Sequence, residues 1–306
     1  MSNRRQFLKD LLAAGAGMGL LSGKMAAVQD KRRDGLFFDI SLAEWSLHRT
    51  LRSNKMTNLD FPRVAREQFD VAAIEYVSTF FKNTKLQYLS ELRSISVNEG
   101  VNNVLIMVDG EGNLGDTDAA ARNQAVENHL KWIETAKYLG CQTIRVNARG
   151  EGSSREVAQA AIEGLSSLSE RAARDGINVV VENHGGYSSN AQWLREVIRS
   201  VDMPNCGTLP DFGNFNINAQ ESYNRYKGIK ELMPYAKGVS AKTYDFDERG
   251  NETSMDFRRI LQIVQRANYH GYIGIEYEGS RLSEQEGILA TKKLIERVGK
   301  DLSHSG

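Results

Sequence analysis

Acidic residues that follow apolar segments have the clearest capacity for chemistry in this chain. The stretch VVVENHGG, residues 179–186, runs from three valines into Glu182, Asn183 and His184. The valines predict a buried strand, and the two glycines predict its end. Because an unpaired carboxylate is costly to bury, Glu182 needs a metal ion, a substrate or a basic side chain as its partner.

Two further carboxylates follow apolar segments in the same manner. Asp211 ends CGTLPD, and Glu276 lies in YIGIEYEG. Like charges gathered in one pocket raise one another's pKa unless a cation balances them. Three carboxylates therefore suggest one divalent metal ion, Mn²⁺, Mg²⁺ or, if a histidine joins, Zn²⁺. Neutralisation by a lysine, for which Lys242 is the candidate, is the alternative.

These carboxylates belong to an alternation of apolar strands and amphipathic helices. The predicted strands are 37–42, 71–77, 102–108, 142–147, 177–182, 205–211, 237–242 and 272–277. The predicted helices are 61–69, 84–97, 119–139, 154–175, 190–201, 221–235, 256–267 and 283–299. Eight such units predict an α/β fold, a single (β/α)8 TIM barrel over residues 36–302. A doubly wound sheet is the alternative, but SLAEWSLH after the first strand lacks its glycine-rich turn.

In a TIM barrel the catalytic groups stand at the carboxyl ends of the strands. Side chains of a strand alternate between two faces, which identifies a set of inward polar residues near these ends. The set is Glu75, Arg145, Asn147, Glu182, His184, Asp211, Ser240, Lys242, Glu276 and Glu278. The opposite halves of the strands are apolar or small, so the pattern predicts an active-site mouth. For any single residue, a salt bridge that closes the barrel is the structural alternative.

The order of VVVENHGG, LPDFGN and GIEYEG resembles the sugar-phosphate isomerase/epimerase family of xylose-isomerase-like TIM barrels. Segments such as KGVSAK resemble an exported branch of that family. The resemblance implies one divalent metal ion, and Glu182, Asp211 and Glu276 match three of its ligand positions. The fourth position is a histidine in the family and Ser240 here, which makes His184 a further candidate ligand.

The resemblance also implies a reaction, proton abstraction beside a carbonyl of a small carbohydrate. Glu182 and Glu276 would move protons through an enediolate, as in an isomerase or epimerase of a keto-sugar or polyol derivative. The residues that would bind the substrate are Arg145, Asn147, His184, Lys242 and, unless it packs in the core, Trp45.

Three other functions compete with this reading. A lyase or hydratase acting on 3-keto-glycosides needs the same proton abstraction. A non-catalytic sugar-binding protein would follow from the loss of the strand-seven histidine. An endonuclease IV-like enzyme needs more histidines and a basic face, whereas this chain has five histidines and a formal net charge of zero. We therefore expect no nucleic-acid partner.

The N-terminus has a different composition from the predicted barrel. SNRRQFLK places Arg4 and Arg5 before an apolar stretch, 11–23, that is too short to span a bilayer. Residues 1–35 therefore resemble a twin-arginine signal peptide with a short linker. This predicts export by the twin-arginine translocation machinery to the periplasm or another extracytoplasmic space. Residues 303–306 are a short tail.

Three further residues with reactive side chains receive structural interpretations. Cys141 and Cys206 precede different predicted strands, so we expect two buried free thiols, although an exported protein could pair them. His129 lies on the predicted helix 119–139 and is interpreted as a structural histidine.

Overall fold

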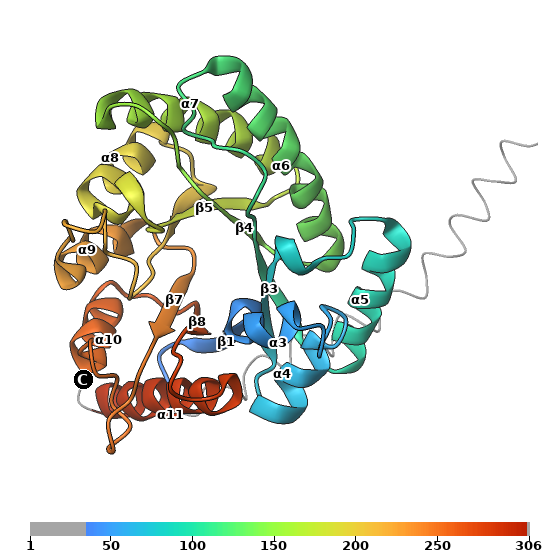
Figure 1. Cartoon of the computed structure of the whole chain (residues 1–306), viewed down its shortest axis with the longest axis vertical. Coiled ribbons are helices and arrows are strands. Elements are labelled where there is room, and N and C mark those ends of the chain that lie inside the picture. Colours follow the sequence, from blue (N-terminus) through green and yellow to red (C-terminus); the bar gives the residue numbers. More distant parts are fainter. Residues whose placement is uncertain (1–34, 305–306) are drawn as a thin grey trace, which may run out of the picture.

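The strands form a curled parallel sheet around one axis, with the helices outside it (Figure 1). The structure, a computed structural model, describes residues 35–304. Its strands are β1 (Asp39–Ala43), β2 (Ala73–Val77), β3 (Asn102–Met107), β4 (Thr143–Val146), β5 (Asn178–Glu182), β6 (Cys206–Leu209), β7 (Val239–Thr243) and β8 (Tyr272–Tyr277). All eight predicted strands are confirmed, and the fold is a TIM barrel.

The sheet runs in the order β6-β5-β4-β3-β2-β1-β8-β7, and the barrel closes between β6 and β7. The closure consists of two isolated parallel bridges, Thr208 with Ala236 and Asp211 with Ser240. At the second bridge the Phe212 amide donates to the Ser240 carbonyl at 3.1 Å. The seam of the barrel therefore fixes Asp211 against Ser240.

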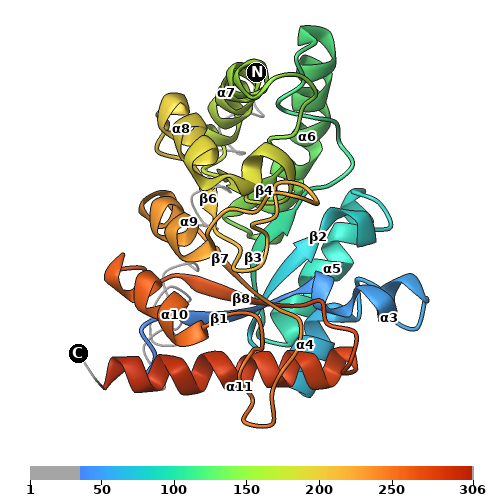
Figure 2. The same ribbon diagram turned by 60° about the vertical axis from the view of Figure 1, so that its left-hand side comes forward.

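The outer helices follow the strands in sequence and surround the barrel (Figure 2). They are α4 (Phe61–Phe69), α5 (Leu86–Asn98), α6 (Ala119–Leu139), α7 (Ser154–Ala173), α8 (Ala191–Val201), α9 (Arg225–Leu232), α10 (Phe257–Arg266) and α11 (Glu284–Ser303). Ser153 and Ser283 begin α7 and α11 with capping boxes, which satisfy amide groups that have no partner inside the helix. Gly140 ends α6 at a φ of 83°. No helix within residues 35–304 is both long and apolar enough to cross a bilayer.

The apolar residues form two layers. The larger layer lies between strands and helices, and a smaller cluster packs on the other strand face. That cluster consists of Ala43, Val77, Leu105, Met107, Val180 and Leu209. Val180 is two residues before Glu182, so both side chains lie on the same face of β5. The candidate carboxylates therefore lie next to this apolar cluster, on the side of the carboxyl ends of the strands.

Two segments differ from the prediction. The loop after β1 contains the 3-10 helix η3 (Glu44–Leu47) and the short helix α3 (His48–Arg52). Both helices are too short for an amphipathic repeat to be recognised in the sequence, so they were not predicted. The predicted helix 221–235 divides into α9 and the 3-10 helix η6 (Met233–Tyr235), because Pro234 has no N–H for the helical ladder.

The minor predictions for cysteine and histidine are confirmed. Cys141 and Cys206 are free and buried, and burial raises the pKa of both thiols. His129 is buried, and its Nδ1 lies 2.7 Å from the Ala125 carbonyl oxygen. Its polar contact is thus satisfied within α6. The proposed signal peptide, residues 1–35, lies outside the described residues except for its last one.

Candidate active site

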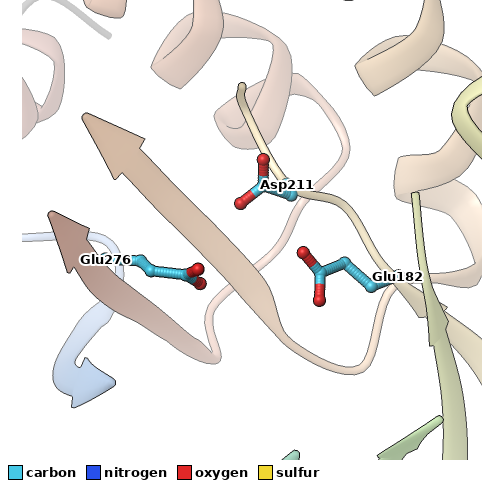
Figure 3. Close-up of side chains that lie close together, drawn as sticks. All are labelled: Glu182, Asp211 and Glu276. Atoms are coloured by element: carbon cyan, nitrogen blue, oxygen red, sulfur yellow. The ribbon is translucent and has the colours of Figure 1, made fainter. Parts of the chain in front are cut away.

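Three buried carboxylates meet at the carboxyl ends of β5, β6 and β8. One oxygen from each of Glu182, Asp211 and Glu276 lies within 4.8 Å of the others. Figure 3 shows Glu182 and Glu276 extending toward one another, with the Asp211 carboxylate facing the same space. None of the three residues is more than 4% exposed. The sequence prediction that these residues lie together is therefore correct.

Two buried cations accompany the carboxylates. Lys242 Nζ lies 2.9 Å from Glu276 Oε1 and 4.0 Å from Asp211 Oδ2. Arg145 Nε lies 2.8 Å from Glu182 Oε2. That contact is an ion pair without a well-directed hydrogen bond, since both atoms are buried without a hydrogen-bond partner. Glu276 is thus paired with Lys242, and Glu182 with Arg145.

Ser240, on β7, where the family resemblance had implied a histidine, connects two of the acids. Its Oγ lies 2.6 Å from Asp211 Oδ2 and 2.9 Å from Glu276 Oε2. A serine hydroxyl carries one proton, so it donates to one of these carboxylates at a time. Ser240 therefore adds no charge to the group and leaves the acids as the strongest metal ligands on these strands.

The loop after β6 holds Asp211 and Glu182 through backbone and amide donors. Asp211 Oδ1 accepts the amides of Gly213 and Asn214, each at 2.8 Å. The Asn214 side chain donates to Glu182 Oε1 at 2.8 Å. A Cβ at Gly213 would lie 2.8 Å from the Tyr244 hydroxyl and 3.0 Å from Lys242 Cγ, so a larger residue there would displace these side chains. The sequence reasoning did not identify Asn214, although it follows Asp211 within the quoted LPDFGN.

The pKa values report how the charges balance. Burial raises the pKa of Glu182 to about 7, although Arg145 opposes this. Burial likewise raises the pKa of Asp211 to about 8, against the pull of Lys242. Burial also acts on Glu276, but the Lys242 ammonium outweighs it and lowers its pKa. Glu182 and Asp211 therefore hold a proton more readily than free carboxyl groups do, and a bound metal ion would have to displace such a proton.

A second network, from β3 to β5, orients Arg145 and His184. Asp109 Oδ1 accepts from Arg145 Nη1 at 2.9 Å and from Asn147 Nδ2 at 2.7 Å. The Asn147 amide therefore turns its oxygen toward His184 Nδ1, 3.0 Å away. Because that oxygen can only accept, Nδ1 carries the proton and Nε2 is left as an acceptor. Arg149 lies 3.3 Å from the same Nδ1, but it donates to the His184 carbonyl at 3.0 Å.

Asp109 was missed by the sequence reasoning, although it stands two residues after the end of β3 and the strand-end rule could have found it. Burial and the surrounding cations, with Arg145, Lys242 and Arg149 among them, lower the pKa of His184 to about 4. The imidazole is therefore neutral near pH 7. A neutral ring with a free Nε2 lone pair can accept a hydrogen bond from a sugar hydroxyl or coordinate a metal.

Glu75 lies elsewhere than the mouth. It occupies the middle of β2, where its Oε1 accepts from Ser41 Oγ at 2.6 Å and its Oε2 has no hydrogen-bond partner. A Cβ at Gly274 would lie 2.6 Å from Glu75 Oε1, so the glycine makes room for this carboxyl group. The sequence pattern predicted the inward face of Glu75 correctly but placed it too near the strand end.

A cleft of about 1070 Å³ opens beside the carboxylates, over the β1 to β4 side of the barrel. Trp45, Asn147 and His184 line it, whereas the three acids do not. Trp45 Nε1 donates to Glu278 Oε1, and Glu278 Oε2 lies 3.4 Å from Lys242 Nζ. Trp45 and Glu278 therefore connect the cleft to the acids. Of the sequence-predicted substrate residues, Trp45, Asn147 and His184 line the cleft, whereas Arg145 and Lys242 lie against the acids.

The donor set of the acids fits a hard divalent cation. Three buried carboxylates converge, with one oxygen of each within 4.8 Å of the others. Oxygen ligands of this kind suit Mg²⁺ or Mn²⁺. The triad could therefore hold one metal ion.

The sequence profile of the xylose isomerase-like TIM barrel family matches residues 62–298. The chain belongs to this family. The match spans the strands that carry all three carboxylates, so the sequence-based recognition of the family is confirmed.

Solved structures of similar fold include sugar epimerases. A D-tagatose 3-epimerase-like protein superposes with a TM-score of 0.69 at 16% identity, covering 88% of this chain and 99% of that one. A 3-keto-D-glucoside 4-epimerase from E. coli gives 0.63 at 16%, covering 84% and 98%. A xylose isomerase-like protein from Mycobacterium smegmatis, in complex with magnesium, gives 0.64 at 15%, covering 88% and 97%.

One curated relative matches over a short segment. The C-glycoside deglycosidase alpha subunit of Arthrobacter globiformis is 41% identical over 66 residues. These residues make up 21% of this chain and 19% of that protein. The match thus spans about a fifth of the relative's length.

Proposed function

We propose that this protein is an isomerase or epimerase that removes a proton beside the carbonyl of a keto-sugar or polyol derivative. The observation that carries the proposal is the pair Glu182 and Glu276, which extend from β5 and β8 toward one common space. Carboxylates on two sides of a bound sugar can remove a proton from one face of a carbon and return it to another. The epimerases among the structural neighbours support the same class of substrate.

Glu182, Asp211 and Glu276 would hold one divalent metal ion, whereas His184 is not among the side chains whose ligand atoms meet within 4.8 Å. When bound, such an ion polarises a substrate carbonyl and stabilises negative charge on its oxygen. The magnesium complex among the structural neighbours supports this proposal. Which divalent ion the protein uses depends on the ligand set and on supply.

The protein groups divide the proton transfer between them. Glu182 takes the proton from the carbon next to the carbonyl, and the electrons of the C–H bond form the enediolate. Glu276, which Lys242 keeps ionised before the reaction, would first take up a proton from solvent and then deliver it to the opposite face of that carbon for epimerisation. For isomerisation it would deliver the proton to the former carbonyl carbon, while the proton of the neighbouring hydroxyl moves to the former carbonyl oxygen. Lys242 and Arg145 provide positive charge beside the developing anion, and His184 Nε2 accepts a hydrogen bond from a sugar hydroxyl.

A lyase acting on 3-keto-glycosides is the second candidate. Two observations favour it, the segment similar to a C-glycoside deglycosidase and a cleft far larger than one sugar ring. After removal of the C2 proton, the electron pair would form a C1–C2 double bond. The bond from C1 to the substituent breaks, and the substituent leaves with that electron pair and takes up a proton. The chemistry at Glu182 is the same, and only the fate of the anion differs.

We also propose that the chain is exported by the twin-arginine route, because Arg4 and Arg5 precede a short apolar stretch. The substrate would then be a carbohydrate available outside the cytoplasm. Replacing both arginines by lysine should leave folded protein in the cytoplasm. Unchanged export of that double variant would remove this proposal.

Product analysis separates the two chemistries. Purified protein with Mn²⁺ is incubated with unphosphorylated ketoses and with methyl and aryl 3-keto-glucosides, and the products are followed by NMR. New epimers with the glycosidic bond intact support the isomerase or epimerase. Release of the aglycone identifies the lyase, and no change in any substrate together with tight binding identifies a sugar-binding protein.

A further inference from the structure

The cleft over the β1 to β4 side is larger than the reaction requires. Its volume of about 1070 Å³ is at the upper end of the roughly 300–1,000 Å³ typical of pockets for drug-sized ligands. A single sugar ring bound at the carboxylates would leave most of this space to solvent. The remaining space starts at Trp45 and His184 and extends away from the acids.

One part of the cleft wall is apolar, while polar side chains such as Asn54, Thr79 and Asn113 line other parts. Met56, Leu59, Phe80 and Tyr88 line the apolar part together with Trp45. The Trp45 and Phe80 ring centroids are 6.0 Å apart. Side chains of this kind favour flat apolar ligands, because aromatic rings pack by offset stacking and edge contacts.

The buried polar groups behind this wall are already paired with one another. The Tyr88 hydroxyl donates to Asn58 Oδ1 at 2.6 Å, and Asn58 Nδ2 donates to Glu44 Oε1 at 2.9 Å. Glu44 Oε2 accepts the Val77 amide at 2.9 Å. A second sugar would need partners for its hydroxyl groups, and these three paired side chains do not supply them.

The rim of the cleft is positively charged. Arg52, Lys82 and Arg149 line it, and all three are exposed. Asp109 also lines the cleft but is paired with Arg145. Lys82 makes no ion pair with any residue in the described range 35–304. An aromatic ring that carries a weakly acidic hydroxyl fits an apolar wall with cations at its edge.

We propose that this cleft is a subsite for the aromatic, phenolic aglycone of a glycoside whose sugar ring lies at the carboxylates. The inference rests on the proposed function for the sugar but not for the binding of the aglycone. The geometry orders the substrate, with the sugar beside Glu182 and Glu276 and the aglycone beyond Trp45. For the lyase, the departing phenol would lie next to Lys82 and Arg52.

Binding of unoxidised glucosides tests the subsite without turnover. Calorimetry would compare 4-nitrophenyl β-D-glucoside with methyl β-D-glucoside and with cellobiose. We expect the aryl glucoside to bind roughly 10- to 100-fold more tightly than the methyl glucoside, since the ring buries apolar surface. Equal affinities, or tighter binding of cellobiose, would overturn the proposal.

Two pairs of variants locate the binding. Thr79→Trp fills the cleft from an exposed position and should weaken aryl glucoside binding at least tenfold while leaving the methyl glucoside unchanged. Thr253→Trp, the same change at an exposed threonine outside the cleft, should have no effect. Lys82→Glu should weaken binding of 4-nitrophenolate, whereas Lys85→Glu, outside the cleft, should not. Unchanged aryl affinity in both cleft variants contradicts the subsite.

The outcomes separate this inference from the proposed function. Selective aryl binding without any turnover of keto-sugars retains the subsite and removes the enzyme proposal. Turnover of keto-sugars with no preference for aryl glucosides retains the enzyme and removes the subsite.

Discussion

The two halves of the barrel mouth differ in the kinds of side chains that line them. On the β5 to β8 side, carboxylates, Lys242 and Ser240 are buried and bonded to one another. On the β1 to β4 side, an open cleft is lined by aromatic and aliphatic side chains with cations at its rim. Polar groups held rigidly by each other are suited to chemistry, and an open apolar wall is suited to selecting a substrate. We infer that reaction and substrate choice are divided between the halves.

The most severe way to break this division is to neutralise the acids. Glu182→Gln and Glu276→Gln keep the side-chain shape but cannot accept a proton. We expect kcat to fall by roughly 10² to 10⁴, the contribution of one general acid–base group. Both variants should melt near the wild-type temperature and should still bind an aryl glucoside. Activity that survives in either variant would remove that residue from the mechanism.

A smaller loss is expected where the two halves meet, at Asp109. Asp109→Asn removes the charge that orients Arg145 and lets the Asn147 amide reverse. Loss of such an orienting partner costs about 10- to 100-fold in metal affinity or activity, and we expect kcat to fall in this range. The kcat pH profile should shift as well, because the His184 tautomer is no longer fixed. Asp70→Asn, at an exposed position, is the matched control and should change neither quantity.

The strands and the three acids could be predicted from the sequence, because both follow local rules. Buried parallel strands appear as apolar runs, and the two-residue alternation identifies which side chains face inward. The sequence pattern placed Glu75 too near the carboxyl end of its strand. Alternation predicts which face of the sheet a side chain lies on, but not how far along the barrel axis it lies. The cleft could not be predicted, since its wall combines residues 51–59 with Phe80 and Tyr88, which only tertiary packing brings together.

A histidine at position 240 tests the proposed metal site. Ser240→His adds a nitrogen ligand beside Asp211 and Glu276, so Mn²⁺ should bind more tightly and raise the melting temperature more than in the wild type. Ser240→Ala is the control, because it removes the hydroxyl without adding a ligand. If Lys242 alone balances the acids, Ser240→His should instead lower the melting temperature, and Mn²⁺ should not restore it.

The smallest effect, a change in melting temperature, is expected at Glu75, which lies in the middle of β2 and away from the mouth. Burial raises the pKa of Glu75 to about 8, whereas in the unfolded chain the carboxyl group ionises near 4.5. The folded state therefore keeps a proton that the unfolded state loses, and stability falls as the pH rises from about 4.5 to 8. Glu75→Gln has no proton to lose and should melt roughly 2–4 °C above the wild type at pH 9, with less difference at pH 5. Glu67→Gln, an exposed change on α4, should show no such pH dependence.

The central claim is that the acids Glu182, Asp211 and Glu276 hold a divalent metal ion and move a proton beside a sugar carbonyl. The most direct measurement follows deuterium from D₂O into the carbon next to the carbonyl of a ketose or 3-keto-glucoside by NMR. The wild-type protein should catalyse this exchange, lose it with a chelator and regain it with Mn²⁺. Exchange that continues at full rate in the chelator would contradict the metal-assisted mechanism, and no exchange with any such substrate would contradict the proton transfer itself.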